Sequence, residues 1–276
     1  MNTIIILPAY NVSNKISSYA ELLVAHKDNV LFVDDASTDS TFITLTEYGF
    51  NVIKNKKNCG IAFSICKGLE YAIKYGYCYA LLMDADGQHS PEHIDKFFEK
   101  LKTSDFVFGN RFHNISNVPS NKLNANILGA SIINNIFGTK FRDIACGYKG
   151  FKITESLLEK LKQSDGYELV YDILFYALLN NKTIEFVDIT PIYEYNEFLF
   201  SRKSELIALI NVIERYIAKL DIFDFDFKYL KNNISNKKTF EISSQNITFH
   251  CFYLSEHDGY VIQANPLEIK DYIKNI

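Results

Sequence analysis

Short apolar runs alternate with amphipathic segments through the first 110 residues of the chain. The apolar runs predict strands, at residues 3–7, 30–33, 50–53, 79–83 and 106–108. The segments between them have helical spacing, at residues 13–27, 39–49, 60–75 and 91–102. Strands that alternate with helices pair in parallel and carry helices on both faces of their sheet. The pattern therefore predicts an α/β fold, a Rossmann-like three-layer αβα sandwich with a mostly parallel sheet.

The pattern changes beyond residue 110. A polar, Asn-rich stretch at 110–125 predicts a long loop, and long loops in compact domains often serve as lids or binding loops. Helices are predicted at 127–137, 167–179 and 205–220, with a strand at 184–187. From about residue 224, strands at 239–242, 247–254 and 260–264 and a helix that opens at Pro266 follow. We expect a main domain over residues 1–222 and a small α+β appendage over 223–276.

Composition narrows the setting of the protein. The 276 residues are 47% hydrophobic, enough for a sizeable core, and the net charge of −4 gives no reason to expect a nucleic-acid partner. Five cysteines without CxxC spacing favour free thiols in a reducing compartment. No run reaches the roughly 18–20 apolar residues of a membrane span, and the first residues lack the basic flank of a signal peptide. We expect a cytoplasmic protein, and leave open peripheral contact with the inner face of the membrane and a homo-oligomer.

Two carboxylates, Asp84 and Asp86, follow the strand predicted at 79–83, and Gln88 offers a third oxygen. In folds of this class ligands bind at the carboxyl ends of the strands. Hard oxygen ligands suit Mg²⁺ or Mn²⁺, and those ions in turn bind phosphate oxygens. The alternative is that one carboxylate caps the next helix and the other is a solvated turn residue. A zinc site at His89 and His93 is disfavoured, because no third ligand follows at suitable spacing.

The first two predicted strands end in groups that suit a nucleoside. Pro8, Tyr10 and Asn11 follow the first strand, and Asp34 and Asp35 follow the second. An aromatic face can stack on a base, while carboxylates can accept hydrogen bonds from base N–H or ribose hydroxyl groups. Together with the metal site, these residues predict that the protein handles a nucleotide or a diphosphate.

Seven segments in order carry a family resemblance: ILPAYN at 6–11, VDDASTDST at 33–41, DADGQH at 84–89, GNRF at 109–112, DIACGYKGF at 143–151, GYE at 166–168 and SRKS at 201–204. With them the chain resembles the family 2 glycosyltransferases of GT-A fold, most closely the dolichol- and polyprenol-phosphate mannosyl- and glucosyltransferases. The resemblance spans residues 4–220 or so. It departs from the family at Cys146, where serine is usual, which puts a role for that hydroxyl in doubt.

The resemblance implies roles for the donor-site residues. Pro8, Tyr10 and Asn11 would line the nucleotide pocket, Asp34 or Asp35 would recognise the base, and Asp84, Asp86 and Gln88 would hold Mg²⁺ or Mn²⁺ on the diphosphate of a UDP- or GDP-sugar. Arg111 would meet phosphate oxygens, and Arg202 and Lys203 would lie on a loop that closes over the donor. The scarcity of arginine, four residues against 25 lysines, supports the assignment of Arg111, because the planar guanidinium grips phosphate at two points.

The acceptor side is less defined. The resemblance implies a polyprenyl-phosphate or glycan acceptor, inversion at the anomeric carbon and a place in cell-envelope glycan biosynthesis. An ionised lipid phosphate needs no strong base, whereas a sugar hydroxyl needs a carboxylate to take its proton. Asp143 is the predicted base or acceptor-orienting residue, with Glu168 and Asp172 behind it.

Two other classes of protein remain open. A catalytically inactive relative could bind nucleotide sugars as a sensor or partner subunit, although the intact pair Asp84 and Asp86 argues against it. A sugar-1-phosphate nucleotidyltransferase would be expected to show a glycine-rich N-terminal loop, and residues 4–11 contain no glycine. The sequence therefore favours a transferase.

Overall fold

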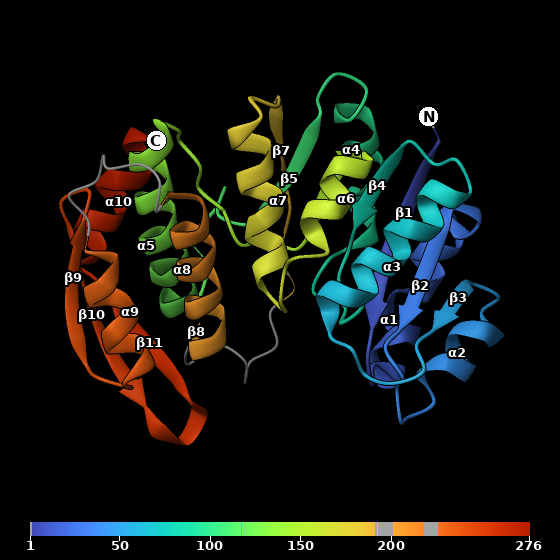
Figure 1. The fold of residues 1–276 in the computed structure, drawn as a ribbon, viewed down its shortest axis with the longest axis horizontal. Coiled ribbons are helices and arrows are strands. Elements are labelled where there is room, and N and C mark those ends of the chain that lie inside the picture. Colours follow the sequence, from blue (N-terminus) through green and yellow to red (C-terminus); the bar gives the residue numbers. More distant parts are fainter. Residues whose placement is uncertain (1, 117, 191, 193–200, 218–225) are drawn as a thin grey trace. The chain divides into compact units, whose positions relative to one another are not determined.

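The structure is a computed structural model that describes residues 2–116, 118–190, 192, 201–217 and 226–276. The chain forms two compact units (Figure 1). The first comprises Met1–Arg111 and Cys146–Ile192, and the second comprises Phe112–Ala145 and Tyr193–Ile276. The domain boundary expected at residue 222 stays a prediction, because a division into compact units does not test which segment folds independently.

A single sheet organises the first unit. In the described residues it has the strand order β3-β2-β1-β4-β6-β5-β7, with β1 at Thr3–Ala9, β2 at Val30–Asp34, β3 at Asn51–Lys54, β4 at Tyr79–Leu82, β5 at Phe106–Asn110, β6 at Lys149–Lys152 and β7 at Ile184–Asp188. Its neighbouring strands are parallel, except that β6 runs antiparallel to both β4 and β5. The predicted mostly parallel sheet is thus confirmed. The sequence did not predict β6, because Lys149, Gly150 and Lys152 leave Phe151 as its one apolar residue.

Helices cover both faces of this sheet, as the alternation of elements predicted (Figure 1). They are α1 (Ser13–Val24), α2 (Thr41–Glu47), α3 (Ile61–Lys74), α4 (Ile94–Lys100), α6 (Glu155–Leu161) and α7 (Glu168–Leu179), with 3₁₀ turns at Lys27–Asn29 and Pro91–His93. Ile5 and Leu7 of β1 belong to the core cluster that includes residues of α1, α2 and α4. Ile6 points to the other face, where Gly68 of α3 lies so close that a Cβ there would come within 2.5 Å of the Ile6 side chain.

An antiparallel sheet organises the second unit. In the described residues its order is β8-β11-β10-β9, from Ser201–Arg202, Gly259–Gln263, Ile247–Leu254 and Phe240–Ser244 respectively. The helices of this unit are α5 (Ser120–Phe137), α8 (Lys203–Ile217), α9 (Phe227–Ser235) and α10 (Pro266–Asn275), with a 3₁₀ turn at Ser255–His257. The predicted strands and the final helix of the α+β appendage are therefore present, and α5 is part of the same unit.

The long loop predicted at 110–125 is wrong at its end, because α5 begins at Ser120. Asparagine is a poor helix former and favours turns, which is why the stretch was predicted as a loop. In the fold, two of these amides are buried and hydrogen-bonded to β11: the Ile262 N–H donates to Asn121 Oδ1 at 2.6 Å, and Asn124 Nδ2 donates to the Ile262 carbonyl at 2.9 Å. Tertiary hydrogen bonds override the weak local propensity.

The remaining general expectations concern cysteines and membrane spans. The five cysteines are free thiols, as predicted. Within the described ranges, no helix has both the length and the apolar character needed to cross a membrane.

Candidate active site

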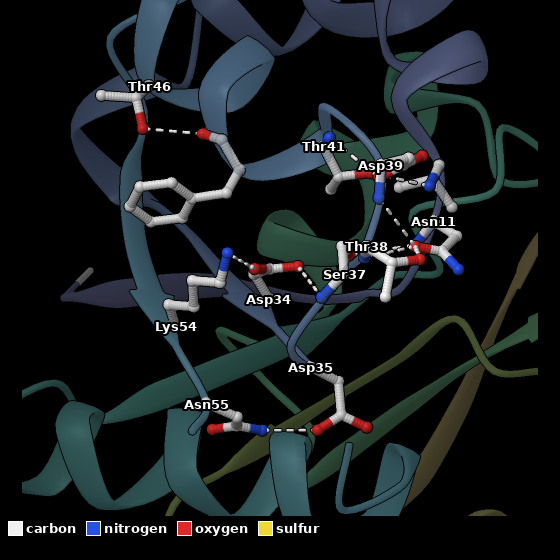
Figure 2. Close-up of polar contacts among 12 residues, drawn as sticks. Asn11, Asp34, Asp35, Ser37, Thr38, Asp39, Thr41, Thr46, Lys54 and Asn55 are labelled. Carbon is white, nitrogen blue, oxygen red and sulfur yellow. Dashed lines mark hydrogen bonds and ion pairs between the residues drawn. The ribbon is translucent and has the colours of Figure 1, made fainter. Parts of the chain in front are cut away.

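The segments that follow β1 and β2 are tied to each other (Figure 2). Asn11 has a φ of 53°, a left-handed conformation that asparagine tolerates better than most residues. Its Oδ1 accepts hydrogen bonds from the Thr38 N–H at 2.9 Å and the Thr38 hydroxyl at 3.3 Å, while the Asn11 N–H donates to Ser37 Oγ at 3.0 Å. The predicted nucleotide-site residue Asn11 therefore fixes the loop after β2 to the end of β1.

Asp39 reinforces this connection (Figure 2). Its Oδ2 accepts from both the N–H and the hydroxyl of Ser13, the first residue of α1, and its Oδ1 accepts from the Thr41 N–H at 2.9 Å. Partial burial acts against the charge, but hydrogen bonds from Thr41 and Ser13 prevail and lower the pKa of Asp39 to about 2. One ionised carboxylate thus serves the starts of both α1 and α2.

Asp34 and Asp35, the predicted base-recognising pair, are both buried but have different partners. Asp34 Oδ1 accepts from the Ser37 N–H at 3.1 Å, and Asp34 Oδ2 lies 3.7 Å from Lys54 Nζ. Asp35 accepts from the backbone N–H of Gly60 at 2.7 Å, immediately before α3, and from Asn55 Nδ2 at 2.7 Å. Asp35 therefore lies at the N-terminus of α3, where a carboxylate is stabilised by the helix dipole.

Tyr10 and Pro8 complete the first strand end. Pro8 lies within β1 opposite Val33 of β2, and the Tyr10 ring follows the strand with 46% of its surface exposed. An exposed aromatic ring at the carboxyl edge of a parallel sheet is available for stacking on a planar group.

The predicted metal residues follow β4, the other neighbour of β1 in the sheet. The side chain of Asp84 is 38% exposed, and the Asp84 N–H donates to His89 Nδ1 at 3.1 Å. The Gln88 N–H donates to Asp86 Oδ1 at 2.9 Å. His89 is buried and stacks on Tyr148 with ring centroids 5.0 Å apart, so it holds the backbone of the carboxylate segment in place.

The electrostatics of this pair favour a cation. Partial burial, with 38% of the side chain exposed, raises the pKa of Asp84 to about 6, against the positive charges of Arg111 and Lys149, which lower it. Burial and the negative charge of Asp84 raise the pKa of Asp86. Two carboxylates that oppose each other's ionisation are stabilised as anions when a cation lies between them.

Gly147 lies against the Asp84 carboxylate. A Cβ at Gly147 would lie 2.7 Å from Asp84 Oδ2 and 3.1 Å from Oδ1, so a larger residue at this position would displace the carboxylate. The hard oxygen donors of the two carboxylates fit Mg²⁺ or Mn²⁺. Among the described residues, no group of three or more His, Cys, Asp or Glu side chains is placed to hold a metal ion, so the two carboxylates would share the ion with other ligands. That is the usual arrangement where the ion also binds substrate phosphates.

Lys149 was not predicted from the sequence. It lies in β6, only 1% of its surface is exposed, and its Nζ lies 4.2 Å from the centre of the Phe108 ring. A buried lysine is costly unless its charge has a purpose or a partner, and this one lowers the pKa of Asp84. One indication of this role is present in the sequence: a lysine lies within the motif at 143–151, between Tyr148 and Gly150.

The other predicted residues fall in both units. Arg111, at the end of the first segment of the first unit, acts electrostatically on Asp84. Glu168 is buried at the first residue of α7. Asp143 and Lys203 belong to the second unit, where Asp143 Oδ1 accepts from the Ala145 N–H at 3.2 Å and Lys203 Nζ donates to the Ser235 carbonyl at 3.3 Å. The backbone of Arg202 pairs with Gly259, and its side chain lies outside the described part of the chain.

These observations describe an α/β protein with an exposed aromatic ring and buried carboxylates at the carboxyl ends of β1 and β2, and with a carboxylate pair suited to a divalent cation after β4. Residues 4–158 match the Glycosyl transferase family 2. The chain belongs to this family, and it is a glycosyltransferase, which confirms the resemblance found in its motifs.

Named relatives share this family. The chain is 28% identical over 238 residues to UDP-N-acetylglucosamine–dolichyl-phosphate N-acetylglucosaminyltransferase of Methanococcus voltae. This match covers 77% of this chain and 94% of the relative. The chain is also 27% identical over 205 residues to undecaprenyl-phosphate mannosyltransferase of Micrococcus luteus, in a match that covers 69% of this chain and 83% of the relative.

A solved structure shares the fold. Glucosyl-3-phosphoglycerate synthase from Mycobacterium tuberculosis in complex with UDP superposes with a TM-score of 0.59 over 81% of each chain, at 15% identity. A complex of the same enzyme with Mn²⁺, UDP and glucosyl-3-phosphoglycerate has a TM-score of 0.59, at 14% identity, and covers 96% of this chain and 87% of that chain. This similarity supports the GT-A-like fold.

Proposed function

We propose that this protein transfers a sugar from a UDP- or GDP-sugar to a polyprenyl-phosphate acceptor, with inversion at the anomeric carbon. The observation that carries the proposal is the pair Asp84 and Asp86, which follows β4, the neighbour of β1 in the sheet, with the Asp84 carboxylate packed against Gly147. Relatives named for dolichyl and undecaprenyl phosphate support the class of acceptor. A glycan hydroxyl is the alternative acceptor.

Donor binding would use the edge formed by β1, β2 and β4. The exposed ring of Tyr10 would stack on the base, beside Pro8, and Asp35 or Asp34 would accept from base N–H or ribose hydroxyl groups. Asn11 would hold Tyr10 and the aspartates in fixed relative positions, because its hydrogen bonds to Ser37 and Thr38 join the segments that follow β1 and β2.

The leaving group is a nucleoside diphosphate, whose negative charge grows as the glycosidic bond breaks. Asp84, Asp86 and Gln88 would hold a divalent cation, which when bound supplies positive charge to the diphosphate oxygens. Arg111 contributes a further positive charge next to Asp84, and the buried Lys149 contributes one that cannot be screened by solvent. UDP and Mn²⁺ in the structurally similar synthase support this assignment.

Asp143 and Glu168 would act on the acceptor side. An ionised lipid phosphate is already a nucleophile and needs orientation, whereas a hydroxyl acceptor needs a carboxylate to take its proton. Asp143 would orient the acceptor or take that proton, with Glu168 as a supporting carboxylate. Arg202 and Lys203 would close over the donor.

The test is to incubate the protein with Mn²⁺, polyprenyl phosphate and each of several UDP- and GDP-sugars, and to measure both released nucleoside diphosphate and glycosylated lipid. We expect one donor to give both products in equal amounts. Asp86→Asn should remove turnover while it leaves the melting temperature within a few degrees of the wild-type value. Pyrophosphate release from a sugar phosphate and a nucleoside triphosphate, or tight donor binding without transfer to any acceptor, would refute the proposal.

A further inference from the structure

Helix α5 carries buried asparagines that make its interior unusually polar. Asn124, Asn126 and Asn134 are each 6–7% exposed. An amide side chain in such a position is stable only when its hydrogen bonds are satisfied within the protein. The hydrogen-bond partners of these three residues therefore show which segments of the chain α5 holds in place.

Asn134 holds the segment that follows α5. Its Oδ1 accepts from the Phe141 N–H and from the Thr139 hydroxyl, both at 2.8 Å, and its Nδ2 donates to the Phe141 carbonyl at 2.9 Å. Nδ2 also donates to the Tyr272 hydroxyl in α10 at 2.8 Å. All four hydrogen-bonding positions of the amide are used.

Asn126 holds the same segment two turns earlier on the helix. Its Oδ1 accepts from the Ile144 N–H at 3.1 Å, and its Nδ2 donates to the Arg142 carbonyl. Residues on both sides of Asp143 are thus fixed by α5, and Asp143 itself is 2% exposed. The close packing of Ile144 adds to this, since a Cβ at Gly129 of α5 would lie 2.7 Å from the Ile144 side chain.

The C-terminal helix α10 takes part in this arrangement. Besides the hydroxyl of Tyr272, its last turn supplies the Ile273 carbonyl, to which Arg142 Nη2 donates at 3.3 Å. A cation at the C-terminus of a helix is also favoured by the helix dipole. Arg142, one of the few arginines of the chain, therefore links the Asp143 segment to α10.

We propose that Asn126 and Asn134 are positioning residues for Asp143, and that α10 contributes to the transfer reaction by locking Asn134 through Tyr272. The inference rests on the proposed function, because it takes Asp143 to act on the acceptor. It gives the C-terminal region a chemical role, since α10 then helps to set the direction of the carboxylate that meets the incoming acceptor oxygen. Misplacement of a reacting group by about 1 Å can reduce a rate by ~100-fold.

Asn124 offers a matched control. It lies on the same helix with the same burial, but its Nδ2 donates to the Ile262 carbonyl in β11 rather than to the segment around Asp143. Asn126→Ala and Asn124→Ala should therefore lower the melting temperature by similar amounts. Only Asn126→Ala should lower kcat/KM for the acceptor, by roughly 10- to 100-fold, with KM for the donor changed less than about twofold.

Two further variants make the test specific. In the Asp143→Asn background, Asn126→Ala should have no additional effect on the rate, because a positioning residue acts through the group that it positions. Tyr272→Phe keeps the packing of α10 and removes one hydrogen bond to Asn134, so it should give a smaller loss in the same parameter. Equal activity of the Asn124 and Asn126 variants, or effects that multiply in the double variant, would overturn the inference.

Hydrogen exchange separates failure of this inference from failure of the proposed function. The N–H groups of Phe141 and Ile144 should exchange faster in Asn134→Ala and Asn126→Ala respectively, and at the wild-type rate in Asn124→Ala. Unchanged exchange would overturn the positioning role even if transfer is observed. Faster exchange in a protein that transfers no sugar to any acceptor would refute the proposed function and, with it, the role of the segment in catalysis.

Discussion

Replacing Gly147 by alanine should disable the carboxylate pair while leaving the fold intact. The new Cβ would lie 2.7 Å from Asp84 Oδ2, whereas ordinary contacts begin at 3.4 Å, so the carboxylate must retreat by about 0.7 Å. Its partner His89 is buried, and the Asp84 backbone N–H is bound to that ring, so the segment has little freedom to follow. The displacement falls on the group proposed to hold the cation.

The magnitude follows from that displacement. A shift approaching 1 Å in a positioned group can cost up to ~100-fold in rate, and overpacking a close-packed site costs typically about 1–3 kcal/mol of stability. We therefore expect Gly147→Ala to lower kcat by roughly 10- to 100-fold, and to raise the Mn²⁺ concentration needed for half-maximal rate. The assay is nucleoside diphosphate release as a function of Mn²⁺ concentration at saturating donor, with thermal unfolding measured in parallel.

Gly150 provides the control, three residues further along. A Cβ there would lie 2.9 Å from the Leu101 side chain, so Gly150→Ala overpacks the apolar interior without touching a carboxylate. Both variants should lose stability, and only Gly147→Ala should lose its response to Mn²⁺. If Gly147→Ala keeps the wild-type rate and Mn²⁺ dependence, or if Gly150→Ala loses as much activity, Asp84 does not hold the cation.

Three further outcomes can be checked on the same protein. Because the pKa of Asp84 is raised from 3.8 to about 6, protons should compete with Mn²⁺ for the carboxylate, and the rise in melting temperature caused by Mn²⁺ should be smaller at pH 5.5 than at pH 7.5. Without Mn²⁺, the stability of the protein should instead fall as the pH rises from about 4 to about 6, because the folded state binds the proton of Asp84 more tightly than the unfolded state. Lys149→Met should move the midpoint of that Mn²⁺ effect to higher pH, since the lysine lowers the pKa of Asp84, and an unmoved midpoint would contradict this reasoning. Asp39→Asn should lower the free energy of unfolding in urea by about 1 kcal/mol at pH 7, because Ser13 and Thr41 lose a charged acceptor that is partly screened by solvent. The stability difference between the two proteins should disappear as the pH falls from 3.8 towards 2, where Asp39 becomes protonated. Equal stability of the two proteins at pH 7 would contradict the role of Asp39.

The sequence predicted the strand edge well, because each element there combines an apolar run with a polar stop. The runs before Tyr10, Asp35 and Asp84 are buried strands in adjacent positions of the sheet, as their composition and order indicated. What composition could not show was which atoms are already used inside the protein. Asn11 and Asp35 are bound by backbone and side-chain groups far away in sequence.

The second unit was harder to predict, because long-range hydrogen bonds decide its structure. Asn121 and Asn124 favour a loop by propensity, and in the fold their amides are hydrogen-bonded to the backbone of Ile262, about 140 residues later. Cys146, which the motif could not place, is fully buried in the core cluster, with its Sγ 4.0 Å from His89 Nε2.

The reversed direction of β6 has a consequence for how such a protein can change. An antiparallel strand begins at the edge where its parallel neighbours end, so the chain leaves this edge after β5 and returns to it at the start of β6. The two points are in contact, since the Gly109 N–H donates to the Tyr148 carbonyl at 2.9 Å. Whatever connects them, here residues 112–145, closes a loop whose ends are already fixed, so its length and sequence can vary at small cost to the sheet. Segments of different length and sequence, taken from relatives, could therefore replace residues 112–145 while the parallel strands around the junction are kept.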